Sequence, residues 1–274
     1  MSVDYSVSAT IRPLLRTHRL DDFTTLLGGD VGELLRSEKG GRELRRLTLA
    51  GPDGLEQFYL KRLGREPLPR LLRVYLSGHR PHSGPMRELL ALNCLRDAGF
   101  AVMEPVAWGE RRRLGFPIAG FLLVRGVPGD DAAALFESLD REARLALLEE
   151  CGALVGRLHA AGFFHVVRLK DLIRDRVSGK LVLIDRETGK PWPARFSRQR
   201  AVASLARAAR RTLRDGHRFG PAAVRRFLSG YARGVAAAWS VQRVELRKTV
   251  FDSLRLELGG KPQASKKNSS KQLI

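Results

Sequence analysis

The fold of this chain is decided by one stretch, QFYLKR at residues 57–62, an apolar strand pattern that carries Lys61 near its end. Two similar strand patterns come before it, at residues 33–37 and 44–49, and a turn separates each neighbouring pair. The second turn, Pro52-Asp53-Gly54, combines a proline that presets φ with a glycine that accepts positive φ. Three strand patterns joined by short turns predict an antiparallel meander.

A helix pattern follows the meander. Ser83 suits its N-cap and Pro85 its first turn, and leucines keep the helical spacing until Gly99. Apolar runs at residues 100–108 and 116–124 then predict two more strands. The first part of the chain is therefore predicted to hold a five-stranded antiparallel sheet with one prominent helix.

Beyond Arg125 the patterns become mainly helical. Helical spacing extends over residues 141–161, 201–214 and 222–238, and one apolar strand pattern lies at residues 180–184. Strands gathered before helices predict an α+β fold in two lobes.

Several positions in this order have the residue types that phosphoryl transfer needs, because its transition state depends on positioned charge. Lys61 would neutralise phosphates, Glu88 on the helix would hold that lysine, and Gly40 and Gly41 lie in a turn that would cover the phosphates. Asp185 directly follows a buried strand pattern and would hold a metal ion. Taken one at a time, the other residues have ordinary explanations. Lys61 could be a surface lysine, Glu88 an acid that stabilises the helix dipole, and Gly40 and Gly41 an ordinary hairpin turn. Asp185 is harder to explain, since charges avoid buried strand ends without a partner.

Several segments carry a family resemblance, which extends over about residues 30–235. They are FYLKR (58–62), RELLAL (87–92), AGF (98–100), EPVAWGE (104–110), LHAAGFFH (158–165), LIDR (183–186), SLAR (204–207) and RFLSGY (226–231). Together they resemble the lipopolysaccharide kinase (Kdo/WaaP) family, and the match LHxxGFxH followed by LID is its most specific part.

The resemblance implies a two-lobed protein-kinase-like fold that uses ATP and Mg²⁺. It implies transfer of the γ-phosphoryl group to a sugar hydroxyl (heptose or Kdo) of the lipopolysaccharide core. The candidate nucleotide contacts are Gly40, Gly41, Lys61 and Val124.

The domain organisation follows from the change from strand to helix patterns near Arg125 and from the resemblance. Residues 1–125 are predicted to form the nucleotide-binding lobe, with an N-terminal extension at residues 1–30. Residues 126–258 are predicted to form the catalytic-loop and substrate lobe. Residues 259–274 are rich in Lys, Ser and Asn, which predicts a basic disordered tail.

The catalytic loop departs from the kinase pattern H-R-D-x-x-x-x-N. Starting from His165, the position of the base Asp is taken by Val167 and that of the metal-binding Asn by Leu172. Val can neither accept a proton nor orient a hydroxyl. General-base help is worth about 10²–10⁴-fold, so its loss slows a kinase without forbidding the reaction.

A one-residue deletion in the alignment places Asp171 where the Asn would be. Asp171 and Asp185 would then hold Mg²⁺ together with the phosphates. The equally weighted alternative is that Asp171 is a solvated loop charge balanced by Arg168 and Lys170.

The net charge of +20 creates a field that attracts phosphates, anionic lipid or nucleic acid. Arginine-rich codon usage is an equally good explanation of it. No run of about 18 apolar residues is present. We predict a cytoplasmic monomer, with peripheral binding to the anionic inner leaflet as the role that the charge would serve.

Three functions stay open at this point. The first is an ATP-dependent kinase acting on a lipopolysaccharide core or a related glycolipid. The second is a catalytically impaired pseudokinase or scaffold, which Val167 and Leu172 support. Nucleic-acid binding ranks last, because no recognition motif accompanies the charge.

Overall fold

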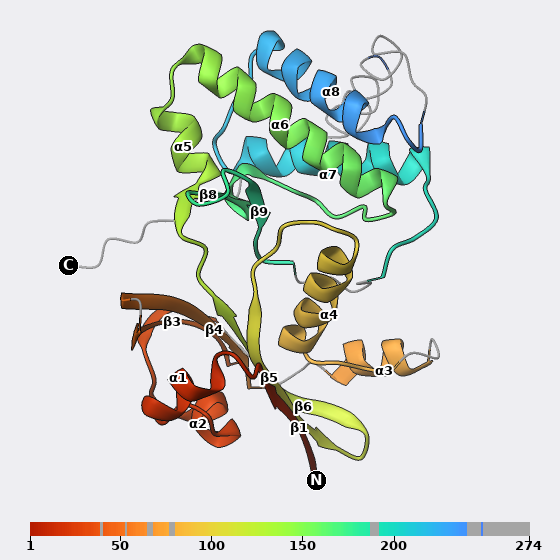
Figure 1. Cartoon of the computed structure of the whole chain (residues 1–274). Helices are drawn as coiled ribbons and strands as arrows, with labels where there is room; N and C mark the ends of the chain where they lie inside the picture. Colours follow the sequence, from red (N-terminus) through yellow and green to blue (C-terminus); the bar gives the residue numbers. More distant parts are fainter. Residues whose placement is uncertain are drawn as a thin grey trace, which may run out of the picture. The chain divides into compact units, whose positions relative to one another are not determined.

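The computed structural model describes residues 1–38, 41–52, 54–64, 68–76, 80–186, 192–239 and 248. The chain divides into two compact units (Figure 1): Met1–Leu139 with Leu169–Ala194, and Asp140–Arg168 with Arg195–Ile274. The predicted lobes, which meet after Arg125, are a functional division and stay a prediction. The predicted tail at residues 259–274 lies outside the described residues.

An antiparallel sheet dominates the first unit. Within the described residues it has six strands in the order β1-β5-β6-β4-β3-β2. They are β1 (Ser2–Val7), β2 (Glu33–Glu38), β3 (Arg42–Gly51), β4 (Gly54–Leu63), β5 (Pro105–Arg113) and β6 (Phe116–Arg125). The predicted meander is confirmed as β2-β3-β4. The predicted count of five strands is one short, because Ser2–Val7 pairs with β5 as an edge strand.

Strand β5 begins later than predicted and continues through a charged stretch. Its Glu110 and Arg112 are buried and form an ion pair. Glu110 Oε1 also accepts a hydrogen bond of 2.6 Å from the backbone N–H of Ser83. Ser83 is the N-cap residue of helix α4 (Gly84–Asp97), as predicted, but its side chain makes no capping bond. The buried carboxylate of Glu110 holds the start of α4 instead.

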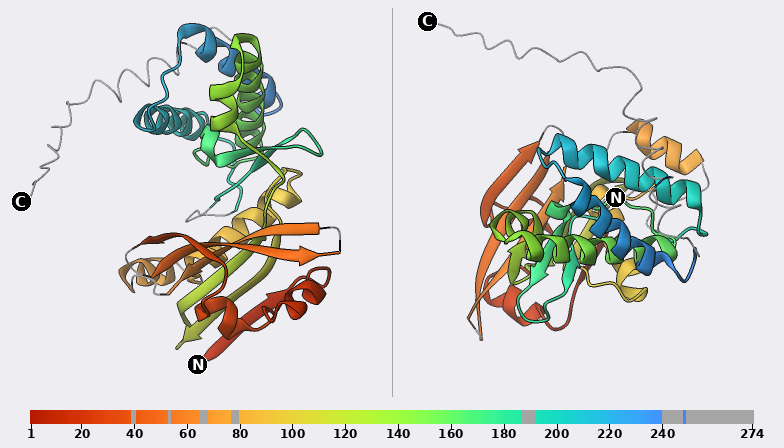
Figure 2. Two further views of the ribbon diagram at one scale, coloured as in Figure 1. Left: turned by 90° about the vertical axis from the view of Figure 1, so that its left-hand side faces the viewer. Right: turned by 90° about the horizontal axis from the view of Figure 1, so that it is seen from above.

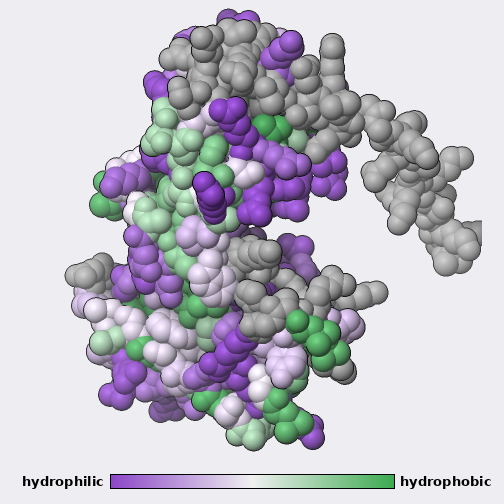
Figure 3. All heavy atoms as spheres, turned by 90° about the vertical axis from the view of Figure 1, so that its right-hand side faces the viewer, coloured by the Kyte–Doolittle hydropathy of each residue, from purple (hydrophilic) through white to green (hydrophobic). Residues whose placement is uncertain are grey.

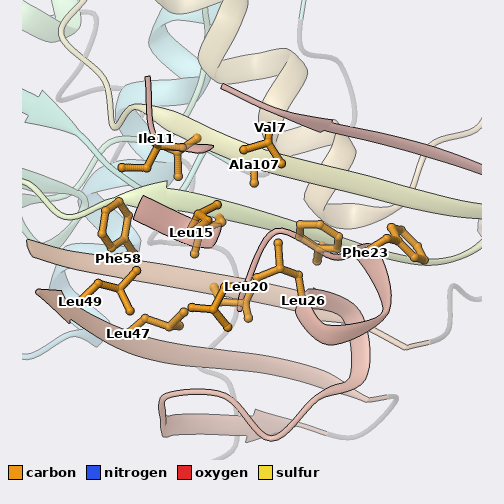
Figure 4. Close-up of a cluster of buried hydrophobic side chains, with 14 residues drawn as sticks. Val7, Ile11, Leu15, Leu20, Phe23, Leu26, Leu47, Leu49, Phe58 and Ala107 are labelled. Atoms are coloured by element: carbon orange, nitrogen blue, oxygen red, sulfur yellow. The ribbon is translucent and has the colours of Figure 1, made fainter. Parts of the chain in front are cut away.

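One face of the sheet packs against the N-terminal segment (Figure 4). Helices α1 (Arg12–Thr17) and α2 (Phe23–Gly28) contribute Leu15, Phe23 and Leu26 to a buried cluster with strand residues such as Phe58 and Phe121. The segment predicted as an extension at residues 1–30 therefore supplies one edge strand and the helices that cover one face of the sheet.

The opposite face packs against α4 (Figure 2). Successive side chains of a strand point to opposite faces. Phe121 and Leu123 accordingly join the α1–α2 cluster, whereas Leu122 and Val124 join a second cluster with Met86, Leu89 and Leu92 of α4.

A small antiparallel sheet completes the first unit. It is formed by β7 (Gly129–Asp131), β8 (Leu172–Asp175) and β9 (Leu181–Leu183). Helix α5 (Ala132–Ser138) and the 3₁₀ turn η1 (Leu169–Asp171) adjoin it. Backbone hydrogen bonds of Leu183 with Ala101 and Met103 attach β9 to the segment before β5. The predicted late buried strand is confirmed as β9.

The second unit is helical in its described part. It contains α6 (Arg141–Ala160), α7 (Arg198–Arg214) and α8 (Pro221–Val235), each close to its predicted bounds. Helices α6 and α8 lie side by side (Figures 1 and 2). His159 of α6 and Tyr231 of α8 are both fully buried, and the His159 Nδ1 to Tyr231 hydroxyl distance is 2.8 Å.

Helix α3 (Leu68–Leu76) was not predicted. Leu72, Tyr75 and Leu76 on it are exposed, and Figure 3 shows hydrophobic side chains on the surface of this unit. None of the helices in the described part of the chain is both long enough and apolar enough to cross a membrane.

Candidate nucleotide and metal site

Strand β4 directs Lys61 toward helix α4. Phe58 and Leu60 point into the α1–α2 cluster, so Tyr59 and Lys61 point to the opposite face. Glu88 stands in the first turns of α4 on that face. The register of one strand and the position of one helix thus bring the two predicted residues together.

Lys61 and Glu88 form a close ion pair. The distance from Lys61 Nζ to Glu88 Oε1 is 2.5 Å, and their side chains are 19% and 4% exposed. Burial lowers the pKa of Lys61, but Glu88 and then Asp185 outweigh it, so the pKa lies above its usual value. Lys61 is therefore held charged and in place, as a lysine that binds phosphates must be.

Asp185 is the second acid in contact with Lys61. Its Oδ1 lies 3.3 Å from Lys61 Nζ, and the pKa of Asp185 is lowered chiefly by the charge of Lys61. The backbone of Asp185 has φ +55°, a left-handed conformation that L residues seldom adopt. Strained backbone of this kind is found at functional sites. The side chain is 66% exposed, so its carboxylate is accessible to a metal ion or a phosphate-bound cation.

Asp171 is joined to the segment before Asp185 by a backbone hydrogen bond, but its side chain is buried, whereas that of Asp185 is exposed. Its backbone carbonyl accepts a hydrogen bond of 3.0 Å from Ile184 N–H, which ties it to the residues before Asp185. Its side chain is 7% exposed, and its Oδ2 lies 3.4 Å from Nη2 of Arg186. The carboxylate predicted as a metal ligand is thus engaged by a cation of the chain itself.

Arg186 was not predicted as a site residue. Its side chain is 4% exposed, and its Nε donates a hydrogen bond of 2.9 Å to the carbonyl of Ile184. Burial lowers the pKa of Arg186, while Asp171, Asp185 and Glu88 act in the opposite direction. The available signal was an arginine placed directly after the apolar strand and Asp185, where a buried charge needs a partner.

The two substituted loop positions are apolar and buried. Leu172 begins β8, pairs with Leu183 and is packed in the interior of the first unit. Val167 belongs to the second unit and is also buried. Neither side chain can ligate a metal ion or take a proton.

The other candidate nucleotide contacts have separate outcomes. Gly40 lies outside the described residues. Gly41 has φ +71°, and its carbonyl accepts a hydrogen bond of 2.9 Å from Gly64 N–H, which closes the strand pair β3–β4. Val124 pairs with Tyr59 and is fully buried against α4. Nucleotide contact by these residues stays a prediction.

The metal site has two candidate ligands of unequal fit. In the described part of the chain, no group of three or more His, Cys, Asp or Glu side chains is placed to hold a metal ion. Mg²⁺ in kinases is commonly held by one or two carboxylates together with phosphates. The exposed carboxylate of Asp185 fits that arrangement, whereas Asp171 fits it only without its pairing to Arg186.

Comparison with known proteins agrees with this geometry. The lipopolysaccharide kinase (Kdo/WaaP) family matches residues 31–231. No curated protein matches the chain in sequence. The solved structure of WaaP in complex with acyl carrier protein matches with a TM-score of 0.64 at 19% identity, over 93% of this chain and 97% of WaaP.

Two further kinases match more distantly. Glucosamine kinase in complex with glucosamine, ADP and inorganic phosphate has a TM-score of 0.44 at 14% identity, over 78% of this chain and 76% of its own. The PknI kinase domain of Mycobacterium tuberculosis has a TM-score of 0.38 at 15% identity, over 81% and 94%.

The likeness to WaaP shows the predicted protein-kinase-like α+β fold. The family match spans well over half of the chain. The chain therefore belongs to the lipopolysaccharide kinase (Kdo/WaaP) family and is by class a phosphotransferase.

Proposed function

We propose that this protein is an ATP-dependent kinase that phosphorylates a sugar hydroxyl, heptose or Kdo, of a lipopolysaccharide core glycolipid. The observation that supports the proposal best is the chain of contacts Glu88–Lys61–Asp185, with distances of 2.5 and 3.3 Å. These three residues come from a strand, a helix and a loop far apart in sequence. A surface lysine would not need two acids to hold it.

Each residue has a distinct role in this proposal. Lys61 binds the phosphates of ATP, Glu88 keeps Lys61 in position, and Gly40 and Gly41 cover the phosphates. Asp185 binds Mg²⁺ through its exposed carboxylate, and Asp171 is the second candidate carboxylate. Bound Mg²⁺ would neutralise the charge on the transferred phosphoryl group.

Val167 stands where a kinase has the aspartate that accepts the proton of the acceptor hydroxyl, and it cannot take that role. Phosphoryl transfer through a loose transition state depends more on positioning and charge than on a base. We therefore expect turnover slower by about 10²–10⁴-fold than in a kinase with the aspartate.

The second candidate function is a scaffold that binds ATP without transferring phosphate. The observation that favours it is the burial of apolar Val167 and Leu172 at the two catalytic-loop positions. Both candidates require the nucleotide site around Lys61, so nucleotide binding alone does not distinguish them.

Peripheral membrane binding follows from the proposed acceptor. Arg200, Arg207, Arg211 and Arg214 of α7 are exposed and share one helical face, since they are spaced by seven, four and three residues. A cationic stripe of this kind suits an anionic glycolipid surface. The solved structure of WaaP is a complex with acyl carrier protein, so such a carrier is a second partner to test.

The test combines nucleotide binding with turnover. We expect MgATP to raise the melting temperature of the wild type and Lys61→Met to abolish the shift, because the phosphates lose their cation. Lys180→Met, an exposed lysine of the same unit, is the control and should keep the shift. An unchanged shift in Lys61→Met would remove Lys61 from the site.

Turnover then separates the two functions. Transfer of labelled γ-phosphate to purified lipopolysaccharide core supports the kinase. Binding of ATP with no transfer to heptose or Kdo acceptors supports the scaffold.

A further inference from the structure

A buried ion pair lies beside the proposed metal site. Asp171 and Arg186 are both almost fully buried, and their side chains approach to 3.4 Å. Arg186 is also fixed by the hydrogen bond from its Nε to the carbonyl of Ile184. Asp171 is fixed by its own backbone bond to Ile184. Both partners are thus attached to the same residue, the one before Asp185.

In this pair an arginine supplies the positive charge beside a loop carboxylate, where a kinase site usually receives it from a metal ion. In protein kinases two Mg²⁺ ions are held by an aspartate after the late strand and by the catalytic-loop asparagine. Here the aspartate is present as Asp185, but the asparagine position is Leu172, which is buried in β8. The neighbouring carboxylate, Asp171, already has a cation at hydrogen-bonding range.

Arg186 lies against the acid that it neutralises. Its Nη2 is 3.4 Å from Asp171 Oδ2, and both side chains are almost fully buried. A buried charge needs a partner, and each member of this pair is a partner for the other.

We propose that the guanidinium of Arg186 replaces the second metal ion, so that this protein binds ATP with one divalent cation, on Asp185. Arg186 is then a positioning residue that neutralises Asp171 permanently. Only the part of this proposal that concerns ATP binding rests on the proposed function, because the Asp171–Arg186 pair is present without nucleotide.

The first experiment removes the cation and leaves the acid. Arg186→Gln removes the guanidinium that faces the buried carboxylate of Asp171, so we expect a lowered melting temperature that Mn²⁺ or Mg²⁺ alone raises toward the wild-type value. The wild type without nucleotide should show no comparable shift. In the double variant Asp171→Asn/Arg186→Gln the metal response should disappear, because the carboxylate that would bind the ion is gone.

A matched control separates this outcome from general destabilisation. Arg62 is equally buried in the same unit and donates hydrogen bonds to the carbonyls of Leu26 and Thr25. It also lies 3.6 Å from Glu43, but that carboxylate is partly exposed and keeps its pairing with Arg45. Arg62→Gln should lower the melting temperature without any rescue by metal. If Arg186→Gln behaves like Arg62→Gln, Arg186 is merely structural and the proposal fails.

The second experiment needs only the wild type and stays decisive if Arg186→Gln does not fold. Mn²⁺ bound at saturating ATP analogue is counted by electron paramagnetic resonance. We expect one ion per nucleotide, and two ions would overturn the proposal. Absence of nucleotide binding would instead contradict the proposed function, while the metal-alone experiment would still test Arg186.

Discussion

At the scale of single residues, the site shows which predictions a sequence supports. Lys61, Glu88 and Asp185 were predicted from their order along the chain, and the structure brings both acids into contact with Lys61. The Asp171–Arg186 pair was not foreseen, because it depends on the register in which Leu172 pairs with Leu183. Residue types and spacing do not reveal a register between strands this short.

His159 gives a pH-dependent prediction. Burial, followed by the charges of His165 and Arg207, lowers the pKa of His159 to about 3. In the unfolded chain its pKa is about 6.5, so the unfolded state takes up a proton first as the pH falls. Stability should therefore be lost below about pH 6.5, by about 2 kcal/mol at about pH 5.

The measurement compares urea unfolding of the wild type and His159→Asn at neutral and mildly acid pH. Asn does not titrate, and its amide can keep the contact with the Tyr231 hydroxyl. The acid-dependent loss attributed to His159 should be absent from the variant. Equal losses in both proteins would show that other groups cause the effect.

At the scale of elements, helices α6 and α8 approach each other through glycines. A Cβ on Gly152 would lie 2.0 Å from the carbonyl oxygen of Phe227, and one on Gly230 would lie 1.8 Å from that of Glu149. Gly156 and Gly234, each four residues further on, are equally crowded by the partner backbone. The four-residue spacing was visible in the sequence, but which helix the glycines face was not.

Gly152→Ala or Gly230→Ala should therefore destabilise the second unit. Overpacking costs about 1–3 kcal/mol and more where backbone has to move, and here the clashing atoms are backbone. Gly220→Ala, where a Cβ meets nothing within 4 Å, is the control and should cost much less. Thermal or urea unfolding measures the difference, and similar losses at Gly220 and Gly230 would contradict the close approach.

The strands show why apolar content alone misplaces an element. An apolar run predicted a strand at residues 100–108, yet β5 spans Pro105–Arg113 and includes buried Glu110 and Arg112. Their charges are compensated by each other and by backbone groups, and no such compensation can be read from a sequence. Strand β1 was not predicted, although Val3, Tyr5 and Val7 alternate with polar residues. It is an edge strand that pairs only with β5, so its sequence pattern is short and partly polar.

At the scale of the whole molecule, we propose that the net charge of +20 acts on a membrane surface mainly through the arginine stripe of α7. Substituting the four stripe arginines of α7 by Gln should weaken binding to anionic vesicles. Each basic residue near such a surface contributes about 1 kcal/mol, so the loss is on the order of 10²–10³-fold. Added salt should weaken wild-type binding in the same direction.

Vesicle sedimentation with a charge-matched control tests this location. The control replaces four exposed arginines of the first unit by Gln, which are Arg36, Arg80, Arg113 and Arg176. It removes the same number of charges and should lose much less binding. Equal losses would assign the effect to net charge and not to α7.

The two units interleave along the chain, and this has a consequence for the order of folding. Asp185 follows Lys61 by 124 positions, and the first unit also needs Leu169–Ala194 for β8 and β9. On a ribosome, Asp140–Arg168 of the second unit emerges before those strands exist. The N-terminal unit therefore cannot finish folding before the second unit begins to emerge, which is the usual order for domains during synthesis. Lys61, the proposed phosphate-binding residue, can therefore pair with Glu88 early but meets Asp185 only after most of the polypeptide has been synthesised.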